Sequence, residues 1–131
     1  MSKKLTVKEI LDSRGLKKLT EIYTHTPLEA EACEKAGVDM IITSELNDYT
    51  RIRSAALNTF FTVGLSYGAH LDEYSILKRC FYLMNKGADA IYCPQSSRFI
   101  KAIADEGIPV IGHSGFIPVS YTHLRAHETE Y

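Results

Sequence analysis

The segment EKAGVDMIIT (34–43) decides the fold, because its pattern returns in NKGADAIYC (85–93) and DEGIPVIGH (105–113). In each copy, charged or polar residues lead to a glycine, and an apolar run follows after a short joint. This pattern is typical of a helix that ends at a left-handed glycine and passes directly into a buried strand. The predicted helix C-caps are Gly37, Gly87 and Gly107.

The remaining chain alternates between strand-like and helix-like segments around these anchors. The predicted strands are 18–23, 38–43, 59–63, 90–93 and 108–111. The predicted helices are 28–36, 48–57, 71–86 and 96–106, with Pro27 in a first turn and Ser96 as a candidate N-cap. Short apolar strands between helices indicate an α/β protein with a parallel sheet. An open doubly wound sheet and a (β/α)8 barrel both fit; five units make somewhat more than half of a barrel of about 250 residues.

The composition excludes several classes of protein. The 131 residues are 45% hydrophobic and 24% charged, with a net charge of −1, so we expect neither wholesale disorder nor a general attraction to nucleic acid. No apolar run approaches a membrane span, and the N-terminus has no apolar signal region. Three widely spaced cysteines without a CxxC pair predict free buried thiols in a cytoplasmic protein.

Candidate functional residues follow the predicted strands, since the active face of such folds lies at the strand carboxyl ends. His113 lies between two glycines. An imidazole there could hydrogen-bond a substrate carboxylate or carbonyl, or transfer a proton. The alternative is that it only stabilises the loop. Glu45 is the carboxylate directly at a strand end. It could bind Mg²⁺ or act as a general base, or it could be a solvated loop residue without a function. His25 shares this edge. Residues 64–68 lack the features of a phosphate loop.

The stretch GIPVIGHSGFIP (107–118) resembles the ketopantoate hydroxymethyltransferase family, which has a GIPV-x-GH-x-G-hydrophobic-x-P segment after its fifth strand. KLTVKEILDSRG (4–15), EAEACEKAGVDMIIT (29–43) and KGADAIY (86–92) resemble further family segments, so the likeness covers roughly residues 4–118. It implies a (β/α)8 barrel, related to phosphoenolpyruvate mutase and isocitrate lyase, that binds Mg²⁺ and a small α-keto acid. It also implies a homo-oligomer that transfers a one-carbon unit from methylenetetrahydrofolate to ketoisovalerate, on the way to pantothenate.

Carried over residue by residue, the resemblance gives His113 the role of the family's substrate-binding histidine. Ser44 stands where the family has a metal-binding aspartate, and Glu45 follows one residue later. The second metal aspartate falls near Gly64, and the family's Lys-x-Glu falls near residues 92–94, where neither residue type is present. We therefore expect Ser44, Glu45 and His113 to bind substrate and Glu45 to bind Mg²⁺. The family's general base lies beyond this chain.

The last residues break the pattern. VSYTHLRAHET (119–129) resembles one reading frame of a transposase sequencing adapter, which predicts a partial TIM-barrel domain over 1–118 and a non-native tail over 119–131. His123 and His127 are one helical turn apart, but they lack a third ligand and the glutamate of HExxH, so they predict no metal site.

Three functions fit these observations. The first is a divergent one-carbon transferase acting on a small α-keto acid, with this truncated chain itself expected to be inactive. The second is another C–C lyase or aldolase of the phosphoenolpyruvate mutase superfamily. The third is a non-catalytic barrel that has lost its metal ligands. The third would act as a binding or scaffold protein. We expect a small α-keto acid as the ligand, with neither nucleic acid nor membrane as a partner.

Overall fold

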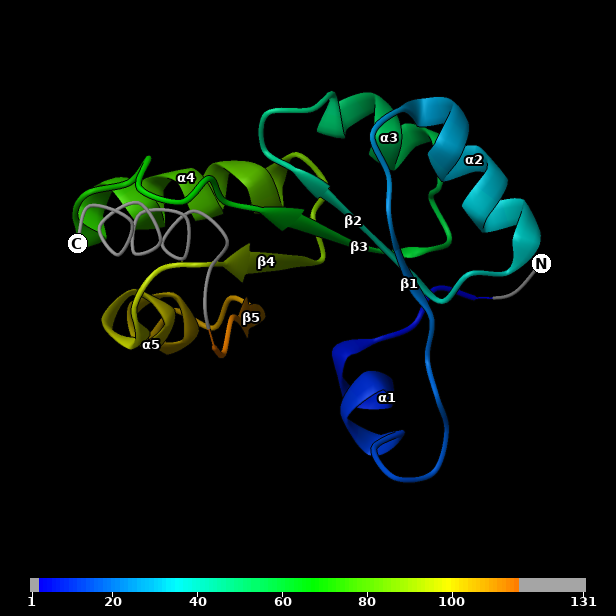
Figure 1. The fold of residues 1–131 in the computed structure, drawn as a ribbon, viewed down its shortest axis with the longest axis horizontal. Helices are drawn as coiled ribbons and strands as arrows, with labels where there is room; N and C mark the ends of the chain where they lie inside the picture. The colour runs from blue at the N-terminus through cyan, green and yellow to red at the C-terminus, as the bar shows by residue number, and fades with distance from the viewer. Residues whose placement is uncertain (1–2, 116–131) are drawn as a thin grey trace, which may run out of the picture.

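The computed structural model describes residues 3–115, which form alternating helices and strands (Figure 1). The strands are β1 (Glu21–Tyr23), β2 (Met40–Ser44), β3 (Phe60–Gly64), β4 (Ala90–Cys93) and β5 (Val110–Gly112). The helices are α1 (Val7–Asp12), α2 (Pro27–Ala36), α3 (Tyr49–Ala55), α4 (Glu73–Asn85) and α5 (Ser97–Asp105). The predicted tail over 119–131 and the domain division at Pro118 lie outside the described residues.

The five strands form one parallel sheet in the order β1-β2-β3-β4-β5. A doubly wound sheet reverses its strand order at a switch point, whereas consecutive barrel strands lie side by side in chain order. The observed order therefore favours the barrel over the open sheet. The α/β class is confirmed, and the structure is consistent with the N-terminal part of a TIM barrel.

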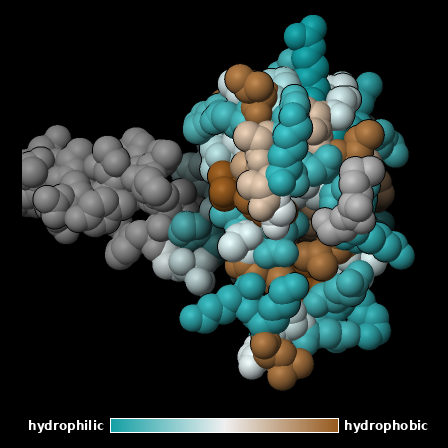
Figure 2. Space-filling model, turned by 90° about the vertical axis from the view of Figure 1, so that its right-hand side faces the viewer, coloured by the Kyte–Doolittle hydropathy of each residue, from teal (hydrophilic) through white to brown (hydrophobic). Residues whose placement is uncertain are grey.

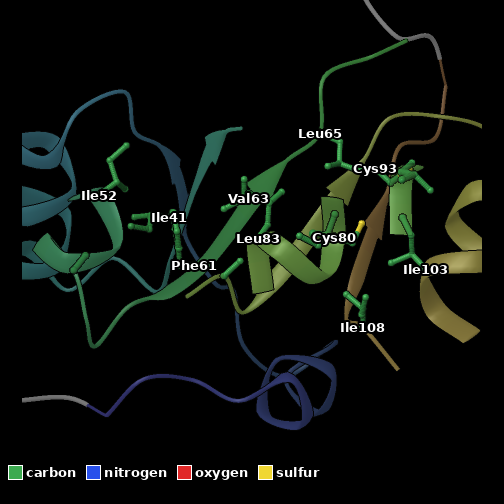
Figure 3. Packing of buried hydrophobic residues seen from close by; sticks show 14 of the residues in the cluster. Ile41, Ile52, Phe61, Val63, Leu65, Cys80, Leu83, Cys93, Ile103 and Ile108 are labelled. Carbon is green, nitrogen blue, oxygen red and sulfur yellow. The ribbon is translucent and has the colours of Figure 1, made fainter. Parts of the chain in front are cut away.

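The main hydrophobic core lies between the sheet and helices α2 to α5. Helix α2 packs on α3, and α4 packs on α5 (Figure 1). Figure 3 shows the core side chains that fill the space between strands and helices. The strands contribute alternate residues to it: Ile41, Phe61, Val63, Ile91 and Cys93. We call this helix-covered side the outer face.

The opposite side of the sheet is called the inner face here. The pairing register places its residues in rows across the strands, because parallel partners point to the same side. It is formed by Met40, Ile42, Ser44, Phe60, Thr62, Gly64, Ala90, Tyr92 and Ile111. In a closed barrel this face lines the interior, where ligands approach from the carboxyl edge.

A partly buried polar cluster joins the amino ends of β3 and β4. Asp89 accepts hydrogen bonds from the Phe61 amide (2.9 Å) and from Arg53 Nη1 (3.0 Å) through Oδ2, and from Lys4 Nζ (2.7 Å) through Oδ1. The Arg53 side chain is only 9% exposed, and its Nη2 donates to the Leu57 carbonyl at 2.7 Å. This end of the fold is thus held by charge pairs remote from the carboxyl edge.

The repeated glycines have the predicted conformation. Gly37, Gly87 and Gly107 have φ values of +80°, +110° and +79°, a region that L-residues with a Cβ rarely adopt. They differ in their surroundings. A Cβ at Gly87 would lie 2.9 Å from Arg53 Cγ, whereas a Cβ at Gly107 would meet nothing within 4 Å.

We expect Gly107→Ala to lower the free energy of unfolding by about 1 kcal/mol, the cost of a left-handed alanine. Gly87→Ala is expected to cost about 1 kcal/mol more, because it also crowds Arg53. Urea denaturation of both variants measures the difference. Equal losses would show that Arg53 yields to the new methyl group without cost.

Two local details differ from the sequence-based expectations. Helix α1 was not predicted, although Thr6 and Glu9 form a complete capping box at its start. Ser96 does lie at the N-cap of α5, but its side chain makes no capping hydrogen bond. Pro27 occupies the first turn of α2, as predicted.

The three cysteines, Cys33, Cys80 and Cys93, are free and buried, as predicted. Burial raises the pKa of Cys80 to about 12, with a further contribution from Cys93, so this thiol is protonated at neutral pH. None of the helices in residues 3–115 has the length and apolar character needed to cross a membrane. On the face shown in Figure 2, apolar patches are separated by hydrophilic side chains.

Candidate functional site

Polar side chains gather at the carboxyl edge of the sheet, on both of its faces. His113 follows β5 directly, and its Nδ1 lies 2.7 Å from the hydroxyl of Tyr92 on β4. The two rings meet edge to face, with centroids 6.2 Å apart. Because Tyr92 belongs to the inner face, this contact places His113 there too. Its position fits the predicted substrate-binding role, which stays a prediction.

Ser44 ends β2 on the same face. It is in register with Gly64 of β3, which is in turn in register with Tyr92 of β4. The Ser44 Oγ accepts a hydrogen bond from the Leu46 amide at 3.1 Å, which shapes the turn after the strand. The structure therefore brings two of the three predicted substrate-binding residues, Ser44 and His113, to one edge of one face.

Glu45, the third predicted residue, points to the outer face. Its side chain is only 5% exposed. One carboxylate oxygen, Oε1, accepts a hydrogen bond from Arg79 Nε of α4 at 2.7 Å. The other, Oε2, accepts one from the Ser66 amide at 2.6 Å and lies 3.0 Å from His70 Nε2. We call Glu45, Ser66, His70 and Arg79 the Glu45 cluster.

The Glu45 cluster holds its carboxylate in the ionised form. Burial by itself raises the pKa of Glu45, but the hydrogen bonds from Ser66, His70 and Arg79 outweigh it, so the pKa lies below the ordinary value of 4.5. Arg79 also lies over the rings of Tyr49 and Tyr82, at 5.8 and 5.2 Å. The cluster joins the end of β2 to the β3–α4 loop and to α4, which is a structural role.

The residues present do not fit the magnesium ion predicted at Glu45. A shift of one residue along a strand moves a side chain to the opposite face, so Glu45 does not replace the acidic residue expected at Ser44. Both carboxylate oxygens already accept hydrogen bonds, and the Arg79 guanidinium repels a cation. Throughout residues 3–115, no group of three His, Cys, Asp or Glu side chains is placed to hold a metal. No chemical step is therefore derived through Mg²⁺.

His25 lies at the start of α2 and takes part in local contacts. Its amide donates to Glu29 Oε1 at 3.1 Å, and its ring packs on Tyr23 with centroids 4.6 Å apart. Asn47 joins this corner to the end of β2, since its side-chain amide donates to Tyr23 Oη at 3.1 Å and to Thr43 Oγ1 at 3.0 Å. These contacts hold the β1 and β2 ends together.

A pocket of about 320 Å³ lies between the β3–α4 loop and the start of α5. Its lining includes Tyr67, His70, Gln95, Arg98 and Phe99. None of the three predicted substrate-binding residues lines it. It is therefore separate from the inner-face edge, and it touches the Glu45 cluster through His70.

Residues that the sequence analysis missed carry much of this geometry. Tyr92 contacts His113, and the strand alternation alone would have placed Tyr92 opposite the core residues Ile91 and Cys93. His70 and Arg79 carried no comparable signal, because their contacts with Glu45 join a strand end to a distant loop and helix.

The fold defines a parallel α/β protein whose sheet is consistent with the N-terminal part of a TIM barrel. Comparison with known proteins agrees. The chain is 23% identical over 138 residues to 3-methyl-2-oxobutanoate hydroxymethyltransferase of Kosmotoga olearia, covering 87% of this chain and 52% of that protein. The enzymes of the same name from Thermosipho africanus (27% over 152 residues; 96% and 57% covered) and Staphylothermus marinus (26% over 148 residues; 93% and 54% covered) are similar too.

These similarities support a relationship to ketopantoate hydroxymethyltransferase-like proteins and confirm the resemblance found in the motifs. No protein-family profile matches the chain. The chain spans about half the length of the curated relatives it matches. The activity of the relatives is consequently a proposal for this chain.

Proposed function

We propose that this chain is the N-terminal part of a divergent hydroxymethyltransferase-like enzyme that binds a small α-keto acid, with 3-methyl-2-oxobutanoate as the first candidate. The observation that carries the proposal is His113 on the inner face, at the carboxyl end of β5 and hydrogen-bonded to Tyr92. An imidazole in this position donates a hydrogen bond to a carboxylate or keto oxygen. The names of the relatives support the choice of keto acid.

Ser44 supplies a hydroxyl on the same edge, two strands from Tyr92. Together, a ring N–H and a hydroxyl suit the two oxygen-bearing groups of an α-keto acid. Methylenetetrahydrofolate as the one-carbon donor, a homo-oligomeric state and a cytoplasmic location stay predictions from the sequence. The free buried cysteines are compatible with a reducing compartment.

We expect His113→Ala to weaken the binding of 3-methyl-2-oxobutanoate at least tenfold, because a hydrogen bond to a charged group contributes about 1.5–3 kcal/mol. Isothermal titration calorimetry on the chain measures the affinity. His25→Ala is the matched control, since His25 is exposed at the same edge but bound to α2, and we expect it to leave the affinity unchanged. Equal affinity of wild type and His113→Ala would exclude this role.

A non-catalytic binding barrel is the second candidate. The engagement of Glu45 by Ser66, His70 and Arg79 favours it, because that carboxylate is not available for chemistry. The two candidates differ in exchange of the keto acid's α-proton in D₂O by the full-length protein, which would include the general base expected beyond this chain. A transferase of this class removes that proton, whereas a binding barrel binds the acid without exchange. Tighter binding of a different α-keto acid would instead support a lyase of the same superfamily.

A further inference from the structure

The hydrogen bond between Tyr92 and His113 can run in two directions, from the phenol to Nδ1 or from Nδ1–H to the phenol oxygen. The Tyr92 side chain is half-buried, and burial, with a smaller effect of Cys93, raises the pKa of its phenol. The hydroxyl is therefore protonated at neutral pH and carries one proton to donate. A phenol O–H is a stronger donor than an imidazole N–H, and an unprotonated imidazole nitrogen is a stronger acceptor than a phenol oxygen, so donation from the phenol to Nδ1 is the favoured direction. At 2.7 Å, the hydroxyl and Nδ1 are at the distance of such a bond.

Donation by Tyr92 would set the tautomer of the histidine ring. If Nδ1 accepts the phenol proton, the ring proton of the neutral histidine is on Nε2. The ring then has a donor on the side away from Tyr92. This tautomer suits an acceptor ligand such as a carboxylate or a keto oxygen, and it does not suit a ligand that donates a hydrogen bond.

Gly64 provides the space that the tyrosine ring occupies. A Cβ at this position would lie 3.3 Å from Tyr92 Cδ1 and 3.8 Å from Tyr92 Cβ, tighter than ordinary packing at the first contact. Gly64 and Tyr92 are register partners on β3 and β4. The glycine therefore lets the ring lie against β3, in the orientation from which its hydroxyl reaches His113.

Gly112 supports the histidine from the other side. A Cβ there would lie 2.8 Å from Ile100 Cδ1, so a larger residue at this position would force the end of the Ile100 side chain on α5 to move. The residue that follows is His113. The backbone next to His113 thus packs against α5 on the outer face, whereas the His113 ring contacts Tyr92 on the inner face.

We propose that Tyr92 is a positioning residue that holds His113 in the Nε2–H tautomer, so that the ring donates a hydrogen bond to an acceptor oxygen of the bound ligand. The identity of that ligand as an α-keto acid rests on the proposed function. The tautomer itself does not, because it is inferred from the contact in the free protein.

The test is the ring nitrogen spectrum of the chain labelled with ¹⁵N-histidine, recorded near pH 8. Long-range ¹H–¹⁵N correlations identify which nitrogen carries the proton. For wild type we expect the His113 signals of an unprotonated Nδ1 and a protonated Nε2. Tyr92→Phe keeps the ring and removes the hydroxyl, and we expect its His113 signals to move toward a mixture of tautomers.

Two further variants make the test specific. Tyr82→Phe removes a hydroxyl from α4 on the outer side and is expected to leave the His113 signals unchanged. Gly64→Ala crowds the Tyr92 ring and is expected to shift them in the same direction as Tyr92→Phe. A protonated Nδ1 in wild type, or identical His113 tautomers in wild type and Tyr92→Phe, would overturn the proposal.

Binding then separates this inference from the proposed function. We expect the Kd for 3-methyl-2-oxobutanoate to rise roughly fivefold in Tyr92→Phe, the effect of one weakened hydrogen bond. If the tautomer is as proposed but neither protein binds a keto acid, the proposed function fails and the positioning role stands. If wild type binds the keto acid while its His113 carries the proton on Nδ1, the positioning role fails and the proposed function stands.

Discussion

Replacing Glu45 with alanine is expected to lower the free energy of unfolding by about 3 kcal/mol, because removing one partner of a buried charge pair leaves the others unpaired. The substitution removes the acceptor of the Ser66 amide, of Arg79 Nε and of the His70 ring contact at once. Chemical denaturation monitored by circular dichroism measures the loss. Glu31→Ala is the matched control: Glu31 is an exposed helix carboxylate paired with Lys35, and we expect its removal to change the stability little.

The same carboxylate gives a pH dependence with a defined sign. The pKa of Glu45 in the folded protein lies below its ordinary value of 4.5, so the ionised form is favoured by folding. Its contribution to stability is present above about pH 4.5 and is lost as the pH falls through the folded-state pKa. Glu45→Gln removes this titration, and we expect a shallower loss of stability below pH 4.5 than in wild type. Parallel curves for the two proteins would contradict the account of the Glu45 cluster.

Replacing Asp89 with alanine is the second change with a large expected effect, again about 3 kcal/mol of unfolding free energy. It leaves the 9% exposed Arg53 guanidinium without its carboxylate and the Phe61 amide without its acceptor. Lys4 also loses its partner, although it is more exposed and contributes less.

The control for Asp89 is Asp105→Ala, which removes a carboxylate paired with Lys101 on the exposed side of α5. We expect that change to be nearly neutral. Because Asp89 lies at the amino ends of the strands, its loss is expected to leave the affinity for a keto acid unchanged under conditions where the variant is folded. A loss of affinity larger than the loss of stability would contradict the assignment of this end of the fold to stability alone.

Much of the fold was predictable, because the glycine-to-strand joints are local signals. The three repeated segments, which contain Gly37, Gly87 and Gly107, predicted three helix ends and the strands that follow them. In the structure each of these glycines has a positive φ. The sequence alone left the open sheet and the barrel unresolved, because strand order is a long-range property. The pairing of β1 to β5 in chain order supplies that information.

The candidate site was only partly predictable. Ser44 and Glu45 are both predicted at one strand end, yet adjacent strand residues point to opposite faces. Side chains two residues apart on a strand point to the same face. Glu45 therefore shares the core side of the sheet with Ile41 and Thr43, and the sequence pattern is enough to predict this. The partners of Glu45 come from a loop and a helix more than 20 residues away, so nothing local marks them. The contact between Tyr92 and His113 likewise depends on the register between β4 and β5.

The most direct test of the central claim, a keto-acid site on the inner face that is independent of Glu45, is an NMR titration of the ¹⁵N-labelled chain. 3-Methyl-2-oxobutanoate is added with and without Mg²⁺, and amide and histidine shifts are followed. We predict the largest shifts at Ser44, Tyr92 and His113, with the same affinity in both conditions. Shifts centred on Glu45, His70 and Arg79, or binding that requires Mg²⁺, would contradict the account.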